Sequence, residues 1–159
     1  MAAMEHANVE FIAALPDITT SNGLLWPISR DRRFRLVRLC KEDEGVSICA
    51  ALAVCGKRSV LLMQHTGFLD SINAIRAIAV EFEQPVCMLV GLQGKEPDRA
   101  SRDSLRYGVR IIEPVIDAMQ IDRLSIEQEQ DVARLAPAIS RAYDRARPFV
   151  ALIGREVRI

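Results

Sequence analysis

The sequence carries no excess charge of either sign. Its 159 residues include 21 Lys and Arg and 21 Asp and Glu, so the formal net charge at pH 7 is zero. A chain without net positive charge has no field to hold a polyanion, which argues against sequence-independent binding to nucleic acid. No apolar run approaches the ~20 residues that span a bilayer, and the first ten residues lack the basic and apolar blocks of a signal peptide. We therefore expect a cytoplasmic protein that does not cross a membrane.

Patterns that bind metal or form redox pairs are also missing. The four cysteines never show paired C-x-x-C spacing and lie inside apolar stretches, which predicts reduced cysteines in the core. The two histidines are far apart and have no carboxylate or cysteine at ligand spacing. We expect no metal site built from this chain alone. These residues are Cys40, Cys49, Cys55, Cys87, His6 and His65.

The apolar pattern indicates an α/β fold. Short runs rich in β-branched residues alternate with longer stretches of helical periodicity, which is typical of a mainly parallel sheet covered by helices on both faces. With half of its residues hydrophobic and no second composition, the chain is predicted to be a single domain, 1–159, with a three-layer α/β/α architecture. The expected strands are 9–15, 34–40, 59–64, 85–91 and 148–154.

The stretches between these strands predict amphipathic helices and one loop. Apolar residues recur at steps of three and four, which marks the buried face of each helix. Residues 92–106 are polar, contain glycine and proline, and predict a surface loop. The predicted buried faces comprise Val46, Cys49, Ala50, Ala53 and Val54; Phe68, Ile72, Ile75, Ala79 and Phe82; and, within 126–147, Val132, Leu135, Ala136, Ile139 and Tyr143.

Two polar segments follow predicted strands. Glu42, Asp43 and Glu44 stand where a strand meets a helix that we expect to begin near Asp43, so they are interpreted either as helix caps or, for Glu42, as a ligand-binding group at the carboxyl edge of the sheet. The segment 64–67 leaves the third strand and enters the next helix. It is either an ordinary turn capped by Thr66 or a second part of the same site.

Together these segments resemble a family. The stretch EDEGVSICAALAVCGKRSVLLMQHTGFLDSINAI (42–75) is similar to the N-terminal, pyrimidine-binding domain of thiamine diphosphate-dependent decarboxylases, in particular of the sulfopyruvate and phosphonopyruvate decarboxylase type. There, an E-x-E-G or N-E-G segment precedes an alanine-rich helix, a G-K turn and a strand ending in M-Q-N-S-G-L-G-N. The segment ALPDITTSNGLLWPI (14–28) matches a V-P-D turn followed by a short helix. Here His65, Thr66 and the residues 68–70 depart from the family pattern.

The resemblance implies roles for individual residues. In the family, a glutamate before the alanine-rich helix hydrogen-bonds the N1′ atom of the aminopyrimidine ring and promotes deprotonation at C2 of the thiazolium. Alignment gives that role to Glu42, with Glu44 as the alternative. Gln64, Thr66 and Gly67 are the expected cofactor-binding residues of the turn. His65 is either an acid-base group near pH 7 or a histidine with a structural hydrogen bond. Asp17 matches the aspartate of the V-P-D turn and is expected to reach the site.

The resemblance also implies a partner chain. Family members bind the diphosphate and magnesium through a separate domain containing G-D-G, and this sequence has no G-D-G. We therefore expect a beta subunit to supply that domain, in a hetero-oligomer or, when the chain is isolated, a homodimer. The implied function is the alpha subunit of a decarboxylase of a small anionic 2-oxo acid. The alternatives are a subunit of a carboligase of the acetolactate synthase type and a non-catalytic scaffold or regulatory partner.

Overall fold

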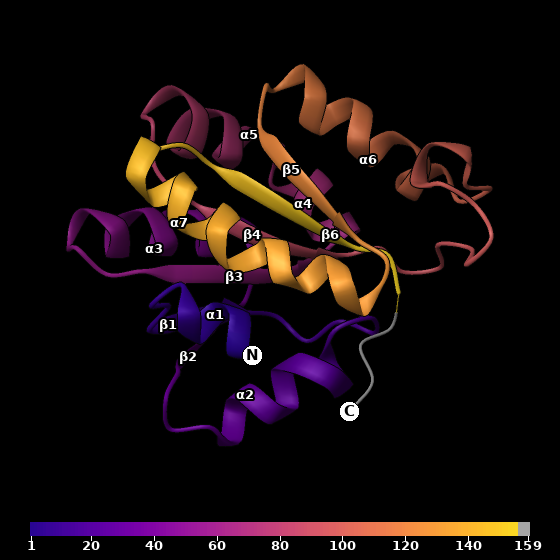
Figure 1. The fold of residues 1–159 in the computed structure, drawn as a ribbon. Coiled ribbons are helices and arrows are strands. Elements are labelled where there is room, and N and C mark those ends of the chain that lie inside the picture. Colours follow the sequence, from indigo (N-terminus) through magenta and orange to yellow (C-terminus); the bar gives the residue numbers. More distant parts are fainter. Residues whose placement is uncertain (156–159) are drawn as a thin grey trace.

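A computed structural model describes residues 1–155, so the last four residues of the predicted domain lie outside the described part. Six parallel strands form one sheet in the order β2-β1-β3-β4-β6-β5. All carboxyl ends therefore lie at one edge of the sheet, on the right in Figure 1. The strands are β1 (Phe11–Ala14), β2 (Arg35–Arg38), β3 (Ser59–Gln64), β4 (Cys87–Gly91), β5 (Asp122–Ile126) and β6 (Phe149–Ile153).

The five predicted strands are confirmed, and one more is present. The strands β4 and β6 are buried at every position, and β3 at all but its last, because helices cover both faces of the middle of the sheet. The additional strand, β5, has the sequence DRLSI, in which only Leu124 is fully buried. It forms one edge of the sheet and has no continuous apolar run, so its sequence did not distinguish it from a loop.

Helices cover the two faces of the sheet and enclose two hydrophobic cores. Met4, Ile28 and Ile139 pack on one face, whereas Cys49, Phe68 and Ile112 pack on the other. Helices α1 and α7 lie in front of the sheet in Figure 1, and α3 and α4 lie behind it. The helices are α1 (Ala2–His6), α2 (Trp26–Arg30), α3 (Glu42–Val54), α4 (His65–Asp70), α5 (Ile72–Ala74), α6 (Tyr107–Ala118) and α7 (Leu135–Arg145).

Several details differ from the expectations. The predicted buried faces include residues that are exposed, namely Val54 at the end of α3, Phe82 after the helical segment Ile75–Glu81, and Val132 before α7. The amphipathic stretch 126–147 begins within β5, continues through a 3-10 turn (Glu129–Arg134) and becomes α-helical only in α7. Of the cysteines, Cys49 and Cys87 are buried, but Cys40 and Cys55 are exposed.

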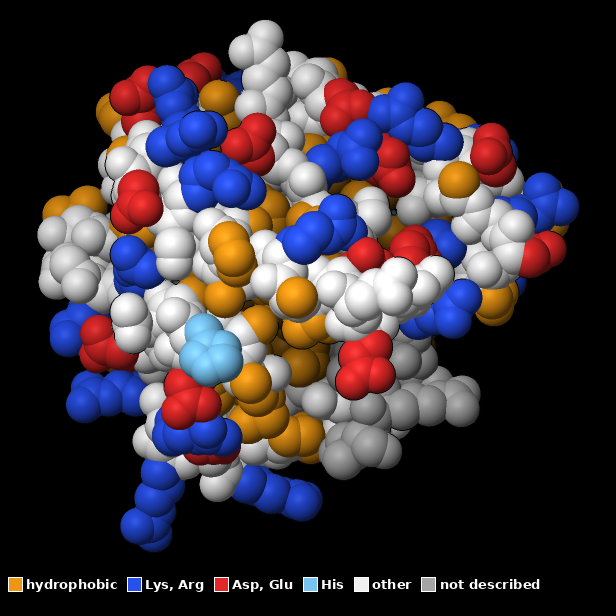
Figure 2. Space-filling view, viewed as in Figure 1, with side chains coloured by type: hydrophobic (Ala, Val, Ile, Leu, Met, Phe, Trp, Pro, Cys, Tyr) orange, Lys and Arg blue, Asp and Glu red, His pale blue; other side chains and the backbone are white. Residues whose placement is uncertain are grey.

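The surface mixes the two signs of charge. In Figure 2, Lys and Arg side chains alternate with Asp and Glu side chains over the face shown, and hydrophobic side chains reach the surface between α7 and α2. Opposite charges interspersed in this way produce no extended field of one sign. Among residues 1–155, no helix has the length and apolar character needed to cross a membrane.

A tyrosine ties α7 to the beginning of β3. The Ser59 N–H donates to the Tyr143 hydroxyl oxygen at 2.6 Å, and that hydroxyl donates to the Ser59 carbonyl at 3.1 Å. Burial raises the pKa of Tyr143 to about 12. The Arg58 guanidinium lies over the ring, 5.1 Å from its centre. The phenol thus satisfies a backbone N–H at a buried residue, Ser59.

We expect Tyr143→Phe to lower the free energy of unfolding by about 1–3 kcal/mol, because it leaves the buried Ser59 N–H without a partner. Urea denaturation measures this change. Tyr107→Phe is the matched control, since Tyr107 also lies under an arginine, Arg110 at 5.3 Å, but is exposed. Equal effects of the two substitutions would contradict the role given to the Ser59 hydrogen bond.

Candidate active site

The acidic segment lies at the carboxyl edge of the sheet, at the beginning of α3. The helix starts at Glu42, with Lys41 as the preceding cap residue, and so begins one residue earlier than expected. Glu42 therefore belongs to the first helical turn rather than standing outside it. The side chain of Lys41 connects this turn to the end of α4, through ion pairs with Asp43 at 3.6 Å and Asp70 at 3.4 Å.

The three carboxylates of this segment have different partners. Glu44 accepts hydrogen bonds from the backbone N–H groups of Cys40 at 3.0 Å and Lys41 at 3.3 Å, which is the reciprocal half of a capping box. Asp43 pairs with Lys41 and accepts the Glu44 N–H at 3.0 Å. The carboxylate of Glu42 has no hydrogen bond or ion pair with any residue in 1–155. The cap interpretation therefore holds for Glu44 and Asp43.

Glu42 instead contacts the turn that follows β3. A methyl group placed on Gly67 would overlap the Cγ, the Cδ and one oxygen of the Glu42 side chain. The absence of a side chain at Gly67 thus leaves the space that the Glu42 carboxylate occupies. Two segments that are far apart in the sequence meet here, because α3, which begins with Glu42, packs against α4, which contains Gly67.

Gln64 and Thr66 border the same position. Gln64 is the last residue of β3 and the cap residue of α4, so the expectation that Thr66 caps this helix is wrong. The amide of Gln64 donates to the Thr66 hydroxyl at 3.2 Å and to the side-chain oxygen of Gln93, which follows β4. Gln93 was not predicted as a site residue. Gln64 pairs with Gly91 in the sheet, and this register brings Gln93, two residues further on, to the same edge. The sequence holds no signal for that register.

His65 points into the protein. Its side chain is 6% exposed and packs under α6, where a methyl group on Gly108 would lie 3.0 Å from Nε2. Burial lowers the pKa of His65, while the Gly91 backbone opposes this shift. The buried Nδ1 atom has no hydrogen-bond partner within residues 1–155. Both features favour a neutral imidazole held between α4 and α6.

Asp17 also lies at this edge, but its carboxylate is already bonded. The residue is 8% exposed and accepts hydrogen bonds from the N–H groups of Thr19 at 2.7 Å and Thr20 at 2.8 Å, and from the Thr20 hydroxyl. These bonds fix the loop after β1 against Gly91 at the end of β4. The predicted site residues therefore share one edge, although Asp17 serves the loop's own structure.

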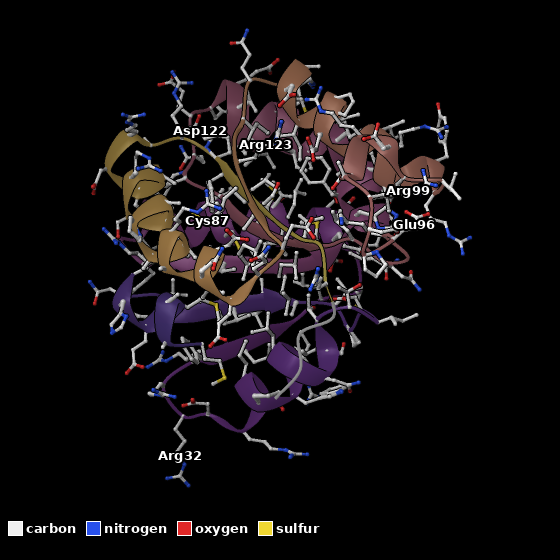
Figure 3. The ribbon with its side chains drawn as sticks, turned by 45° about the vertical axis from the view of Figure 1, so that its right-hand side comes forward. Arg32, Cys87, Glu96, Arg99, Asp122 and Arg123 are labelled. Atoms are coloured by element: carbon white, nitrogen blue, oxygen red, sulfur yellow. The ribbon has the colours of Figure 1, made fainter. Side chains whose placement is uncertain are left out.

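The polar loop 92–106 is held by ion pairs. Arg102 contacts Glu113 at 3.0 Å and also Asp117, and Arg123 contacts Glu113 at 3.2 Å. Arg102 thus fastens the loop to α6, and Arg123 joins the same helix to β5. Figure 3 shows Arg99 beside Glu96 on the loop. The pKa of Glu96 is lowered, mainly by the hydrogen bond from the Ser104 hydroxyl. Within residues 1–155, no group of three His, Cys, Asp or Glu side chains is arranged to hold a metal ion.

The predicted three-layer fold is confirmed. A six-stranded, all-parallel sheet lies between two helical layers, an architecture consistent with a thiamine diphosphate pyrimidine-binding domain. No family model matches the chain.

Individual relatives are more specific. The chain is 28% identical over 135 residues to the sulfopyruvate decarboxylase subunit alpha of Methanocaldococcus jannaschii, covering 84% of this chain and 77% of the relative. It is 26% identical over 156 residues to the sulfopyruvate decarboxylase of Methanosarcina acetivorans, covering 97% of this chain and 38% of the relative. The alpha subunit of Methanothermobacter thermautotrophicus is 26% identical over 114 residues, or 66% and 68% of the two chains. The chain is a distant homologue of the sulfopyruvate decarboxylase alpha subunits.

The contact between Glu42 and Gly67 can be measured by a double-mutant cycle. We expect Gly67→Ala to lower the free energy of unfolding by about 1–3 kcal/mol, because the new methyl group overlaps the Glu42 side chain. In a Glu42→Ala background the same substitution should cost little or nothing, since the space is vacated and alanine favours the helix. Urea denaturation of the four proteins gives the coupling energy. Additive effects would show that the two side chains do not compete for one space.

Proposed function

We propose that this chain is the alpha subunit of a thiamine diphosphate-dependent decarboxylase that acts on a small anionic 2-oxo acid such as sulfopyruvate or phosphonopyruvate. The observation that carries the proposal is the carboxylate of Glu42, seated on Gly67 at the carboxyl edge without a partner in residues 1–155. Distant homology to sulfopyruvate decarboxylase alpha subunits supports the reaction class.

The residues at this edge fit one end of the cofactor. A carboxylate with no competing hydrogen bond is suited to a weakly basic ring nitrogen, with which it shares a proton. Glu42 would hold the proton at N1′ of the aminopyrimidine, and Gln64 and Thr66 would orient the ring. When bound, the cofactor would supply a thiazolium as the sink for the electron pair that the departing carbon dioxide leaves. Glu44 is less suited to the role of Glu42, because its carboxylate is engaged by two backbone N–H groups.

The other end of the cofactor requires a partner. We propose that a beta subunit binds the diphosphate and magnesium. In support, the chain matches 38% of the length of the Methanosarcina sulfopyruvate decarboxylase, while three of its relatives are named as alpha subunits. His65 is proposed to support the turn from below, through its contact with α6, and Asp17 to fix the loop that borders the site.

The test is turnover of a complex with the proposed beta subunit, for which the product of the adjacent reading frame is the first candidate. We expect the native complex to bind thiamine diphosphate and to release carbon dioxide from sulfopyruvate or phosphonopyruvate. Glu42→Gln should still bind the cofactor but lose about 100-fold or more in kcat, because the proton at N1′ is no longer held. Carbon dioxide release and cofactor titration by calorimetry measure the two effects separately.

Glu44→Gln is the matched control, two residues further along the same helical turn. It should retain kcat within a few fold and lose about 1 kcal/mol of stability from the weakened cap. A loss of turnover at Glu44 instead would move the role to that residue. Formation of a carbon-carbon bond, detected among the products, would identify a carboligase. A complex that never binds the cofactor would indicate a scaffold.

Exposed apolar side chains support the carboxyl edge as the surface that meets the beta subunit. Ile18 follows β1, Trp26 begins α2, and Leu105 and Tyr107 lie at the beginning of α6, and all four are exposed. Segments that follow parallel strands begin at the carboxyl edge, and these side chains lie on the segments that follow β1 and β4. Large exposed apolar groups of this kind often mark protein interfaces.

We expect Leu105→Asp to weaken the complex at least tenfold, because it would bury an unpaired charge in the interface. Phe82→Asp is the control, since Phe82 is 73% exposed, against 71% for Leu105, but lies at the opposite edge. Sedimentation or calorimetric titration with the beta subunit measures the difference. Equal weakening by both variants would exclude the carboxyl edge as the interface.

A further inference from the structure

A pocket at the carboxyl edge of the sheet has no role in the proposal above. It has a volume of about 620 Å³ and opens at the carboxyl ends of β4 and β6, next to the loop that follows β1. Lys95 and Arg155 are the charged side chains that line it, and no acidic residue of the described chain does so. Thr19 and Gln93 add polar groups. The lining thus combines positive charge with neutral hydrogen-bonding groups.

Lys95 is the unusual residue of this pocket. Its side chain is only 2% exposed, and its ammonium group pairs with Glu127 at 3.1 Å and donates to the Glu96 carbonyl at 3.2 Å. Burying a lysine is costly unless its charge is compensated, so the pair with Glu127 explains how the ammonium is tolerated. An ammonium group has three N–H donors, and these two contacts account for two of them. One donor remains for a ligand.

Glu127 pairs with Lys95 but is not among the side chains that line the pocket. Its carboxylate packs against Gly154, where any side chain would overlap it, and it lines a neighbouring surface hollow to which Lys95 and Arg155 also belong. On the pocket side, Arg155 and Lys95 meet no lining carboxylate of residues 1–155, and Arg106 lies beside Gly94. A small anion entering the pocket would meet donors and net positive charge.

The pocket adjoins residues of the candidate active site. Gln93, which lines the pocket, accepts a hydrogen bond from Gln64 at the end of β3. Thr19, which also lines it, donates its N–H to Asp17 at 2.7 Å. These two contacts place the pocket beside the Gln64 turn and the loop after β1.

We propose that this pocket binds the second anionic group of the substrate, the sulfonate or phosphonate remote from the 2-oxo acid carbon, and that Lys95 is its principal contact. This inference rests on the proposed function and adds the residue that distinguishes a substrate with two negative groups from one with a single carboxylate. Sulfonate and phosphonate share the chemistry that Lys95 recognises, which is negative charge spread over three oxygens.

The experiment compares sulfopyruvate and phosphonopyruvate with pyruvate, which lacks the second anion, in the complex with the beta subunit. Because Lys95→Met alone would leave Glu127 without its partner, the variant is Lys95→Met/Glu127→Gln. We expect it to raise KM for the dianionic substrate that the native complex uses about tenfold or more, and to leave kcat/KM for pyruvate within about twofold. The matched control is Lys57→Met/Glu10→Gln, an exposed pair at the same 3.1 Å separation.

Equal changes for pyruvate and the dianionic substrates, or no change for either, would overturn the inference while leaving the decarboxylase proposal intact. If the native complex does not turn over, the chain is titrated with sulfoacetate and phosphonoacetate, with acetate as the reference, and binding is followed by NMR. Saturable binding of either probe that is lost in the double variant would support the pocket although the proposed function had failed. No saturable binding to the native chain would overturn the pocket as well.

Discussion

The side chain of Glu42 lies against the backbone of Gly67, and the arrangement of the carboxyl edge depends on this contact. It brings the start of α3 onto the start of α4, across two strand-to-helix junctions that belong to different crossovers of the sheet. A larger residue at 67 would push the carboxylate away, and a shorter one at 42 would leave a gap. Lys41 strengthens the same junction by pairing with Asp43 and Asp70. The electrostatic contribution of these exposed pairs is small, so the packing contact sets the geometry.

Acidic side chains recur along this edge, and their partners separate their roles. Asp17 is saturated by the N–H groups of its own loop, Glu44 caps a helix, and Glu127 compensates a buried lysine. A carboxylate whose acceptor capacity is used by the protein cannot also serve a ligand without losing those bonds. Glu42 differs from them because its carboxylate is positioned by packing and not by hydrogen bonds from residues 1–155. The proposed cofactor role follows from that difference, and the proposed anion pocket from the remaining donor of Lys95.

Much of this could be predicted from the sequence. The continuous apolar runs of β3, β4 and β6 reveal strands buried on both faces, and the three-and-four spacing of Leu135 and Ile139 reveals a helix. The edge strand β5 could not be found in this way, because DRLSI buries only one side chain. Val54 and Phe82 continue the apolar period of their helical segments past the point where these segments still pack on the sheet. The period alone therefore overestimated the buried face.

The sequence by itself determined the α/β class, the parallel sheet, and the places of Glu42 at a strand-to-helix junction and of Gln64 at a strand end, because burial on both faces and the direction of parallel strands impose these features. Only the tertiary structure separated the surroundings of Glu42 from those of Glu44, since two backbone N–H groups donate to the Glu44 carboxylate and none of residues 1–155 to that of Glu42. It also decided that His65 points inward and that Lys95 pairs with Glu127. These contacts join residues of different crossovers, and their geometry depends on strand order and register, which no local pattern encodes.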